Sequence, residues 1–291
     1  MHAHSTLISR MATIAAASAI SALYGGLCSA TPFFFSTGNP DGLIAVATRP
    51  DSPGKFEIEA GDDFVLTGLG NTTITSATFT GLLSGAGISS IGEVRVEIYR
   101  VFPTDSDVGR TPQVPTRVNS PSDVEFDDRD TASGNLTFMT DDLGPGFTAN
   151  NSVKPGGIHP TPNQTTGGDG PVTGEEVEFD VTFTTPFDLP PGHYFFVPHV
   201  EVTVLLGDFF WLSAPWPIVP PGTPFPAGFT DLQSWTRDEF LDPDWLRVGT
   251  DIVGAGTFNA TFSLSGTVPE PGTLLLLGAG LTLMWARRRM S

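Results

Sequence analysis

The sequence predicts an all-β fold, an antiparallel β-sandwich or jelly-roll over residues 31–268 with a short apolar helix on either side of it. Three observations lead to this fold class. Apolar and polar residues alternate at a period of two, no segment between the two ends keeps a helical period over three turns, and the connecting segments are rich in glycine and proline. Two antiparallel sheets that face each other bury one side of each such strand and leave the polar side in water.

The clearest strands are 94–99 and 177–183. In the first, Val94, Val96 and Ile98 alternate with polar or amphipathic residues, and the second repeats this pattern with valine and phenylalanine. Both patterns are typical of half-buried strands. Further strand candidates are the segments 73–79, 135–139, 194–205, 209–212 and 258–264.

Some local features predict turns instead. The segments 56–60 and 64–66 flank Gly61-Asp62-Asp63, so we expect a hairpin there. Short helical turns are expected at 231–235 and 238–245, and Pro243 should end the second one.

Three long segments are expected to be loops: 103–123, 141–176 and the proline-rich 214–229. Loops of this length are uncommon in compact domains and often serve a function. The segment 141–176 is either an elaborated loop packed on a sheet edge or a binding loop, and composition favours the first reading.

Residues 1–30 have the composition of a secretory signal peptide. Arg10 supplies the positive charge, 11–23 form an apolar run, and Cys28-Ser29-Ala30 form a small-residue cleavage site, so cleavage is expected after Ala30. Acylation of Cys28, as in a lipoprotein, is the alternative, but Leu27 is larger than that signal prefers. Cleavage after Ala30 removes the only cysteine, so the domain must be held together by its core.

Residues 269–291 form a third segment, which differs in composition from the domain before it. Pro269-Glu270-Pro271 is followed by an apolar run over 273–286 and then by Arg287, Arg288 and Arg289. A helix of that length rises roughly 20 Å, against a hydrocarbon core of about 30 Å, so it is a marginal permanent anchor. The arginines are expected to stay in the cytoplasm, which places everything before Pro269 outside.

The order of a Pro-Glu-Pro box, a short apolar segment and a terminal arginine cluster resembles the PEP-CTERM sorting signal of Gram-negative envelope proteins. The resemblance implies secretion through the inner membrane, transient retention by the tail and processing near the box by an exosortase, commonly in bacteria that make an extracellular polysaccharide. It assigns the recognition box to Pro269, Glu270 and Pro271, and the cytoplasmic stop to Arg287–Arg289. The implied location is the inner membrane first, then the envelope, the cell surface or the medium.

The charge balance restricts the partners. The chain has 32 acidic residues against 14 basic ones, and four of the basic residues lie in the two terminal segments. Nucleic acids and anionic membrane surfaces favour Lys and Arg, so neither is expected to bind the exported domain.

A candidate calcium site comes from the densest group of carboxylates, Asp123, Asp127, Asp128 and Asp130. Calcium prefers six to eight oxygen ligands, which clustered aspartates can supply. The spacing lacks the glycine and terminal glutamate of an EF-hand, and a solvated strand end is the more common reading of such a run. No other cofactor is expected.

Catalytic signatures are missing from the sequence. It contains no Gly-x-Ser-x-Gly elbow, and the three histidines after the signal do not have zinc-ligand spacing. Carboxylates are so numerous that a glycosidase pair can be drawn in many ways, which makes their number uninformative. We therefore expect the protein not to be an enzyme.

Four tryptophans in the last third, Trp211, Trp216, Trp235 and Trp245, are candidate platforms for stacking on sugar rings. The alternative is that they fill the core, because aromatic residues dominate cores by area.

The leading functional hypothesis is a non-enzymatic module of the cell surface or extracellular matrix that associates with exopolysaccharide. The alternative is a secreted glycan-acting hydrolase, which would need two carboxylates about 5 to 10 Å apart in a cleft, one of them with a raised pKa. A third hypothesis is a purely structural envelope protein.

Overall fold

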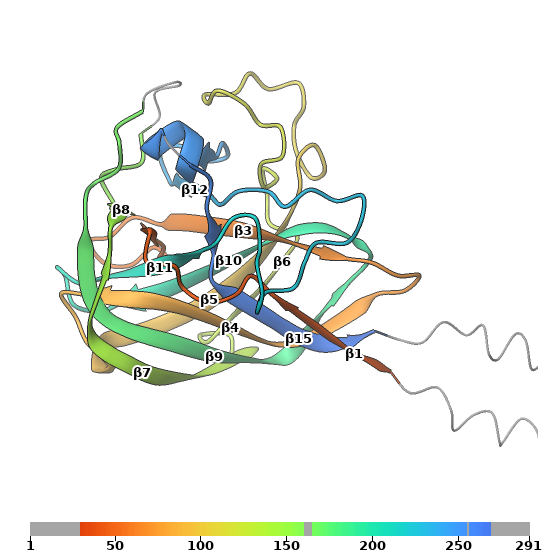
Figure 1. The fold of residues 1–291 in the computed structure, drawn as a ribbon, viewed down its shortest axis with the longest axis horizontal. Coiled ribbons are helices and arrows are strands. Elements are labelled where there is room, and N and C mark those ends of the chain that lie inside the picture. The colour runs from red at the N-terminus through yellow and green to blue at the C-terminus, as the bar shows by residue number, and fades with distance from the viewer. Residues whose placement is uncertain (1–29, 160–164, 255, 269–291) are drawn as a thin grey trace, which may run out of the picture.

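The computed structural model describes residues 30–159, 165–254 and 256–268, which form two packed β-sheets (Figure 1). The predicted sandwich is therefore confirmed. The signal segment, the Pro-Glu-Pro box, the apolar run and the arginine cluster lie outside the described residues. Within the part that is described, no helix is both long and apolar enough to cross a membrane.

The larger sheet contains nine strands. They are β1 (Thr31–Ser36), β2 (Ile44–Ala47), β4 (Thr72–Ser84), β7 (Leu136–Ala149), β8 (Asn151–Val153), β9 (Val172–Leu189), β11 (Asp208–Ala214), β14 (Asn259–Ala260) and β15 (Phe262–Val268).

The smaller sheet contains six strands in the order β13-β12-β3-β10-β5-β6. They are β3 (Ile58–Leu66), β5 (Ile91–Arg100), β6 (Asp127–Asp130), β10 (Gly192–Val202), β12 (Trp235–Asp238) and β13 (Leu246–Arg247). A 3₁₀ turn, η1 (Ile88–Ser90), and a π-helical turn, η2 (Val248–Val253), complete the elements.

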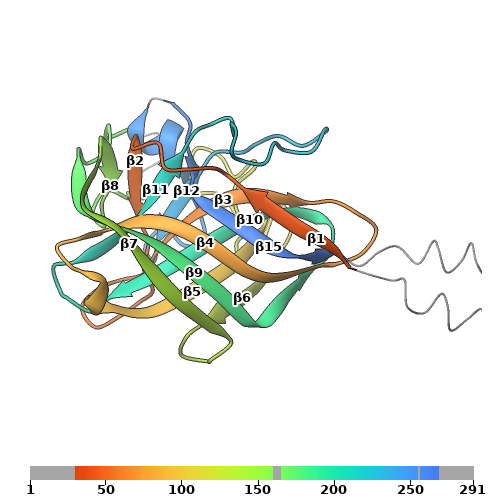
Figure 2. The same cartoon turned by 60° about the horizontal axis from the view of Figure 1, so that its bottom comes forward.

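Strand β4 organises the larger sheet. It pairs with β9 along its length on one edge, and on the other edge with β15 over its first half and β11 over its last residues. Figure 2 shows β4 and β9 side by side across this layer. All strand pairs are antiparallel except β2 with β8. Strand β1 pairs only with β15 and lies at an edge of the sheet.

Aromatic rings fill the space between the sheets. Phe79 and Phe179 stack with ring centroids 4.8 Å apart, and Phe196 and Phe262 stack at 4.9 Å. Phe196 lies on β10 and Phe262 on β15, so the second stack joins the two sheets. Such pairs add about 0.5–1.5 kcal/mol to the free energy gained from burial.

The smaller sheet is also covered on its outer face. A second apolar cluster there contains Tyr99, Phe195, Val197, Leu232, Trp235 and Trp245. Strand alternation explains its origin, because Phe196 of β10 points into the main core while Phe195 and Val197 point the other way. The chain over residues 101–124, 230–234 and 239–245 supplies the cover, so part of the outer face of the six-stranded sheet is buried as well.

Thr31 and Val268 are directly paired at the ends of β1 and β15. The two ends of the described domain, Thr31 directly after the predicted cleavage point and Val268, therefore lie side by side at one end of the sandwich (Figure 1).

The predicted hairpin over 56–66 is wrong. Gly61, Asp62 and Asp63 lie inside the continuous strand β3, which pairs with β12 on one edge and β10 on the other. The two aspartates are tolerated inside the sandwich because their oxygens accept backbone N–H bonds from Ala260 and Leu232. These donors come from residues distant in sequence.

Two further predictions fail in part. The segment 141–176 is not one loop, because β7 continues to Ala149 and pairs with β9. The helical turn predicted at 231–235 is not formed, because residues 231–234 are irregular and lead into β12. Residues 239–243 do form turns between β12 and β13, and the N–H groups of Leu241 and Asp242 donate to the carbonyl of Asp238. The proline-rich segment 214–229 is irregular beyond Ala214, as predicted.

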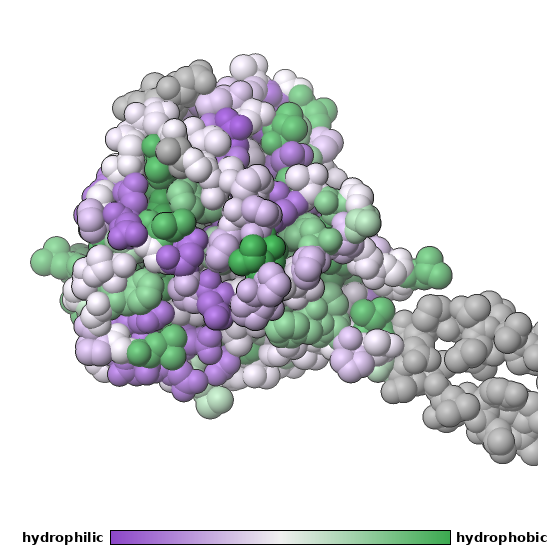
Figure 3. All heavy atoms as spheres, in the orientation of Figure 1, coloured by the Kyte–Doolittle hydropathy of each residue, from purple (hydrophilic) through white to green (hydrophobic). Residues whose placement is uncertain are grey.

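Figure 3 shows that apolar side chains on one face lie in several small groups separated by polar ones. Small scattered apolar groups of this kind are ordinary on the surface of folded proteins.

Candidate functional site

The outer face of the six-stranded sheet carries a row of buried charges. Glu59, Arg237, Glu97, Tyr99 and His199 come from four neighbouring strands, β3, β12, β5 and β10. Strand register brings them together. Arg237 of β12 lies opposite Glu59 of β3, and Glu97 of β5 lies opposite Val197 of β10, two residues before His199. All five residues are less than 9% exposed.

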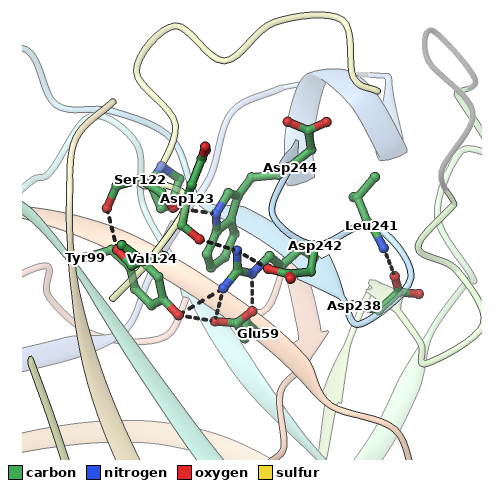
Figure 4. Close-up of polar contacts among 12 residues, drawn as sticks. Glu59, Tyr99, Ser122, Asp123, Val124, Asp238, Leu241, Asp242 and Asp244 are labelled. Atoms are coloured by element: carbon green, nitrogen blue, oxygen red, sulfur yellow. Dashed lines mark hydrogen bonds and ion pairs between the residues drawn. The ribbon is translucent and has the colours of Figure 1, made fainter. Parts of the chain in front are cut away.

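Arg237 and Tyr99 connect the two glutamates. The guanidinium of Arg237 donates to both carboxylate oxygens of Glu59, with Nη2 3.0 Å from Oε1. The Tyr99 hydroxyl lies 2.7 Å from Oε1 of Glu59 and 2.9 Å from Oε2 of Glu97. Nε2 of His199 lies 3.5 Å from the same Glu97 oxygen. Figure 4 shows the hydroxyl of Tyr99 meeting the carboxylate of Glu59.

The two glutamates have opposite pKa shifts. Burial raises the pKa of Glu59, although Arg237 works against this effect. Burial also acts to raise the pKa of Glu97, but His199, Tyr99 and Arg95 outweigh it and lower the pKa to about 2. Burial disfavours the charged form of His199, yet Glu97 raises the pKa of this imidazole above its ordinary value. The carboxylates of Glu59 and Glu97 are thus paired with the guanidinium of Arg237 and the imidazole of His199.

A cleft of about 360 Å³ opens above this group. Its rim is acidic, with one further arginine, and consists of Glu57, Arg95, Asp123, Glu125, Glu239 and Asp242. Arg237 also donates to Asp242 at 2.8 Å and lies over the ring of Trp245, 4.3 Å from its centroid. The network therefore fastens the outer layer to the sheet while its polar edge faces the cleft.

Three of the four candidate tryptophans are core residues. Trp211, Trp235 and Trp245 are each 1% exposed, so the prediction that they stack on sugars is wrong for these three. Trp211 donates from Nε1 to the carbonyl of Thr261 at 2.7 Å in the main core. Trp235 and Trp245 belong to the outer cluster.

Trp216 is the exception, because it is 42% exposed. It lies on the proline-rich segment and lines a cleft of about 190 Å³ together with polar side chains. These are Asn119, Thr230, Asp231, Gln233, Arg247 and Thr257. An exposed ring beside amide, hydroxyl and charged groups matches the composition of small-molecule sites.

The structure does not gather the four aspartates predicted to bind calcium. Asp123 pairs with Arg117 at 2.5 Å, and Asp127 with Arg129 at 2.6 Å. Asp128 and Asp130 alternate with Asp127 on β6 and point to the other face of the strand. Among the described residues, none of the four joins a group of three or more potential metal ligands. The four aspartates therefore do not form the calcium site that the sequence predicted.

Another acidic group does form on the surface. Asp141 of β7 pairs with Glu178 of β9, and Asp180 lies beside them. These residues are exposed or half-buried, as alternation predicts for the solvated face of β9.

Sequence reasoning missed the buried network. The alternation in 94–99 and 56–60 assigned Glu97 and Glu59 to a solvent face, and that face is covered by distant segments. Only the second layer turns these residues from surface charges into a buried group. No pattern within the strands themselves could have revealed it.

Comparison with known proteins bears on the end of the chain. Residues 267–289 match the family model of the PEP-CTERM protein-sorting motif. The chain therefore carries a PEP-CTERM sorting motif, which supports export and processing by an exosortase. No curated protein and no solved structure matches the chain. Ala30 is exposed just before β1, and the six residues of the box and arginine cluster lie outside the described residues.

Proposed function

We propose that this exported protein is a non-enzymatic module of the cell surface or extracellular matrix that binds exopolysaccharide in the Trp216 cleft. Its tail holds it in the inner membrane until the exosortase releases it. The observation that carries the proposal is the 42% exposed indole of Trp216 beside six polar side chains in one cleft. Sugar rings present an apolar face and a rim of hydroxyls, so they suit such a surface.

The indole is held in place by its own nitrogen. Nε1 of Trp216 donates to the carbonyl of Asp231 at 3.2 Å, and the carboxylate of Asp231 accepts the N–H of Ile218 at 2.9 Å. The ring therefore presents one fixed orientation to a ligand, which lowers the entropy lost on binding.

Co-sedimentation with the producing organism's own extracellular polysaccharide tests this proposal. The parent protein should sediment with the polymer, and Trp216→Ala should weaken binding about tenfold, which corresponds to roughly 1.4 kcal/mol. Phe240→Ala is the matched control, because Phe240 is 64% exposed and does not line the cleft. Equal binding by the parent and Trp216→Ala would remove the proposal.

A glycan-acting hydrolase is the second candidate. It is favoured by one observation, the two glutamates joined through Tyr99 at the base of the acidic cleft, with their pKa values shifted in opposite directions. The ion pair between Arg237 and Glu59 speaks against it, because a general acid must carry a proton. Release of new reducing ends from the polymer, lost in both Glu59→Gln and Glu97→Gln, would decide for the hydrolase.

A further inference from the structure

A second group of buried and half-buried carboxylates lies where strand β14 and the irregular segments around Ile218 and Asp231 meet β3. Asp62 is fully buried and its Oδ2 accepts the N–H of Ala260 at 2.8 Å. Oδ1 of the neighbouring Asp63 accepts the N–H of Leu232 at 3.1 Å. Asp231, just before Leu232, uses its Oδ2 to accept the N–H of Ile218.

The contacts among these residues form a closed ring. Asn259, the neighbour of Ala260, donates from Nδ2 to Oδ2 of Asp231 at 3.3 Å. Asp231 leads through Leu232 to Asp63, and Asp63 is bonded along the chain to Asp62. Each member is thus one hydrogen bond or one peptide unit from the next.

Three side-chain oxygens of this ring are buried and have no hydrogen-bond donor. They are Oδ1 of Asp62, Oδ1 of Asp231 and Oδ1 of Asn259. Asn259 is only 1% exposed, and its amide orientation is fixed because Nδ2 also donates to the carbonyl of Pro215 at 3.1 Å. Buried acceptors without a partner cost about 1–3 kcal/mol each, so three in one ring need an explanation.

The ring also has few basic neighbours. It holds three carboxyl groups, and the one basic side chain paired with them among the described residues is His193, which contacts Asp63. No lysine or arginine of the described chain forms an ion pair with Asp62 or Asp231. This is unlike the network around Glu59, where an arginine and a histidine face two glutamates.

We propose that this ring binds a hard divalent cation, calcium, through Oδ1 of Asp62, Oδ1 of Asp231 and Oδ1 of Asn259. Carboxylate and amide oxygens are the ligands that calcium prefers, and backbone carbonyls and water complete its six to eight positions. Asp231 also lines the Trp216 cleft, so the ring lies next to a solvent-filled cleft. The proposal does not depend on glycan binding.

Thermal unfolding of the exported, processed protein tests the site. Calcium at about 100 times Kd should raise Tm by roughly 5 to 10 °C over the value in chelator. Asp231→Asn and Asn259→Ala should each remove most of this shift. Asp141→Asn, in the exposed acidic group, should keep it.

Terbium provides a readout that does not depend on stability. Trp216 donates to the carbonyl of Asp231, so excitation of its indole should sensitise terbium bound in the ring. Calcium should displace the terbium and quench the emission. Trp216→Phe should reduce the emission and keep the calcium-dependent Tm shift.

Two results would overturn the proposal. In the first, the parent protein has the same Tm in calcium and in chelator, and Asp231→Asn raises Tm in both. That result indicates that protons, and not a metal ion, occupy the ring. The other is an equal loss of the calcium shift in Asp141→Asn and Asp231→Asn, which indicates diffuse binding to the acidic surface.

Discussion

Arg237 on β12 lies directly opposite Glu59 on β3, and the two side chains form a two-point ion pair that is almost completely buried. The pair joins two neighbouring strands of the smaller sheet. It also contacts Tyr99 and Trp245, so it joins the sheet to the layer that covers it.

Loss of the arginine should be severe. Arg237→Met leaves the Glu59 charge buried without its partner, and we expect a loss of about 3–5 kcal/mol in the free energy of unfolding. Urea unfolding measures this loss. The double variant Arg237→Met with Glu59→Met should recover part of it, because no charge is then left unpaired.

Arg100→Met is the matched control, since Arg100 and Asp105 form a pair at 3.6 Å with both side chains about one-third exposed. It should cost no more than about 1 kcal/mol. A loss of the same size in Arg100→Met and Arg237→Met would contradict the buried-pair account.

Acid should destabilise the protein through Glu97. Its pKa in the folded state, about 2, lies below the ordinary 4.5, so the unfolded chain takes up the proton more readily. The stability that this carboxylate contributes is present above about pH 4.5 and is lost as the pH falls toward 2. Its size is about 3 kcal/mol at most.

Unfolding measured between pH 5 and pH 2 should therefore show a flatter profile for Glu97→Gln than for the parent. Glu125→Gln changes a carboxylate on the exposed rim of the same cleft and should follow the parent. An unchanged acid slope in Glu97→Gln would show that other groups carry the acid sensitivity.

The core tolerates no side chain at residue 81. A Cβ on Gly81 would overlap the ring of Phe209 and lie 2.6 Å from the carbonyl oxygen of Phe210. Gly81→Ala should lower the free energy of unfolding by about 1–3 kcal/mol. Gly146→Ala, on the exposed part of β7 with nothing within 4 Å, should be neutral in the same chemical denaturation.

The sorting motif makes a prediction about processing. Replacing Glu270 and both flanking prolines, Pro269 and Pro271, should leave an uncleaved form in the inner membrane, because the matched motif contains this box. Immunoblots of membrane and medium fractions detect the change. Normal processing of the triple variant would show that the exosortase does not need the Pro-Glu-Pro box for recognition.

Local pattern was enough for the fold class and most strands. The alternation in 94–99 and 177–183 fixes which side of β5 and β9 enters the core, because side chains in a strand point to opposite faces in turn. The order of residues at the end of the chain also predicted the sorting motif, since that signal is read along the sequence.

The hairpin was mispredicted because Gly61-Asp62-Asp63 has the composition of a turn. Composition carries no information about Ala260 and Leu232, whose N–H groups satisfy the two aspartates inside the strand. Trp235 and Trp245 were ambiguous for a similar reason, because a cover formed by distant segments decides whether a ring is core or surface.

The sequence by itself therefore determined the two-sheet fold, the acidic surface and the sorting of this protein, all of which depend on residues close together in the chain. Only the tertiary structure decided which charges are buried. Glu59 meets Arg237, and Asp62 accepts the N–H of Ala260, across separations of 178 and 198 residues. Burial and pairing depend on these long-range contacts, and the environment they create sets the charge and chemistry of each carboxylate.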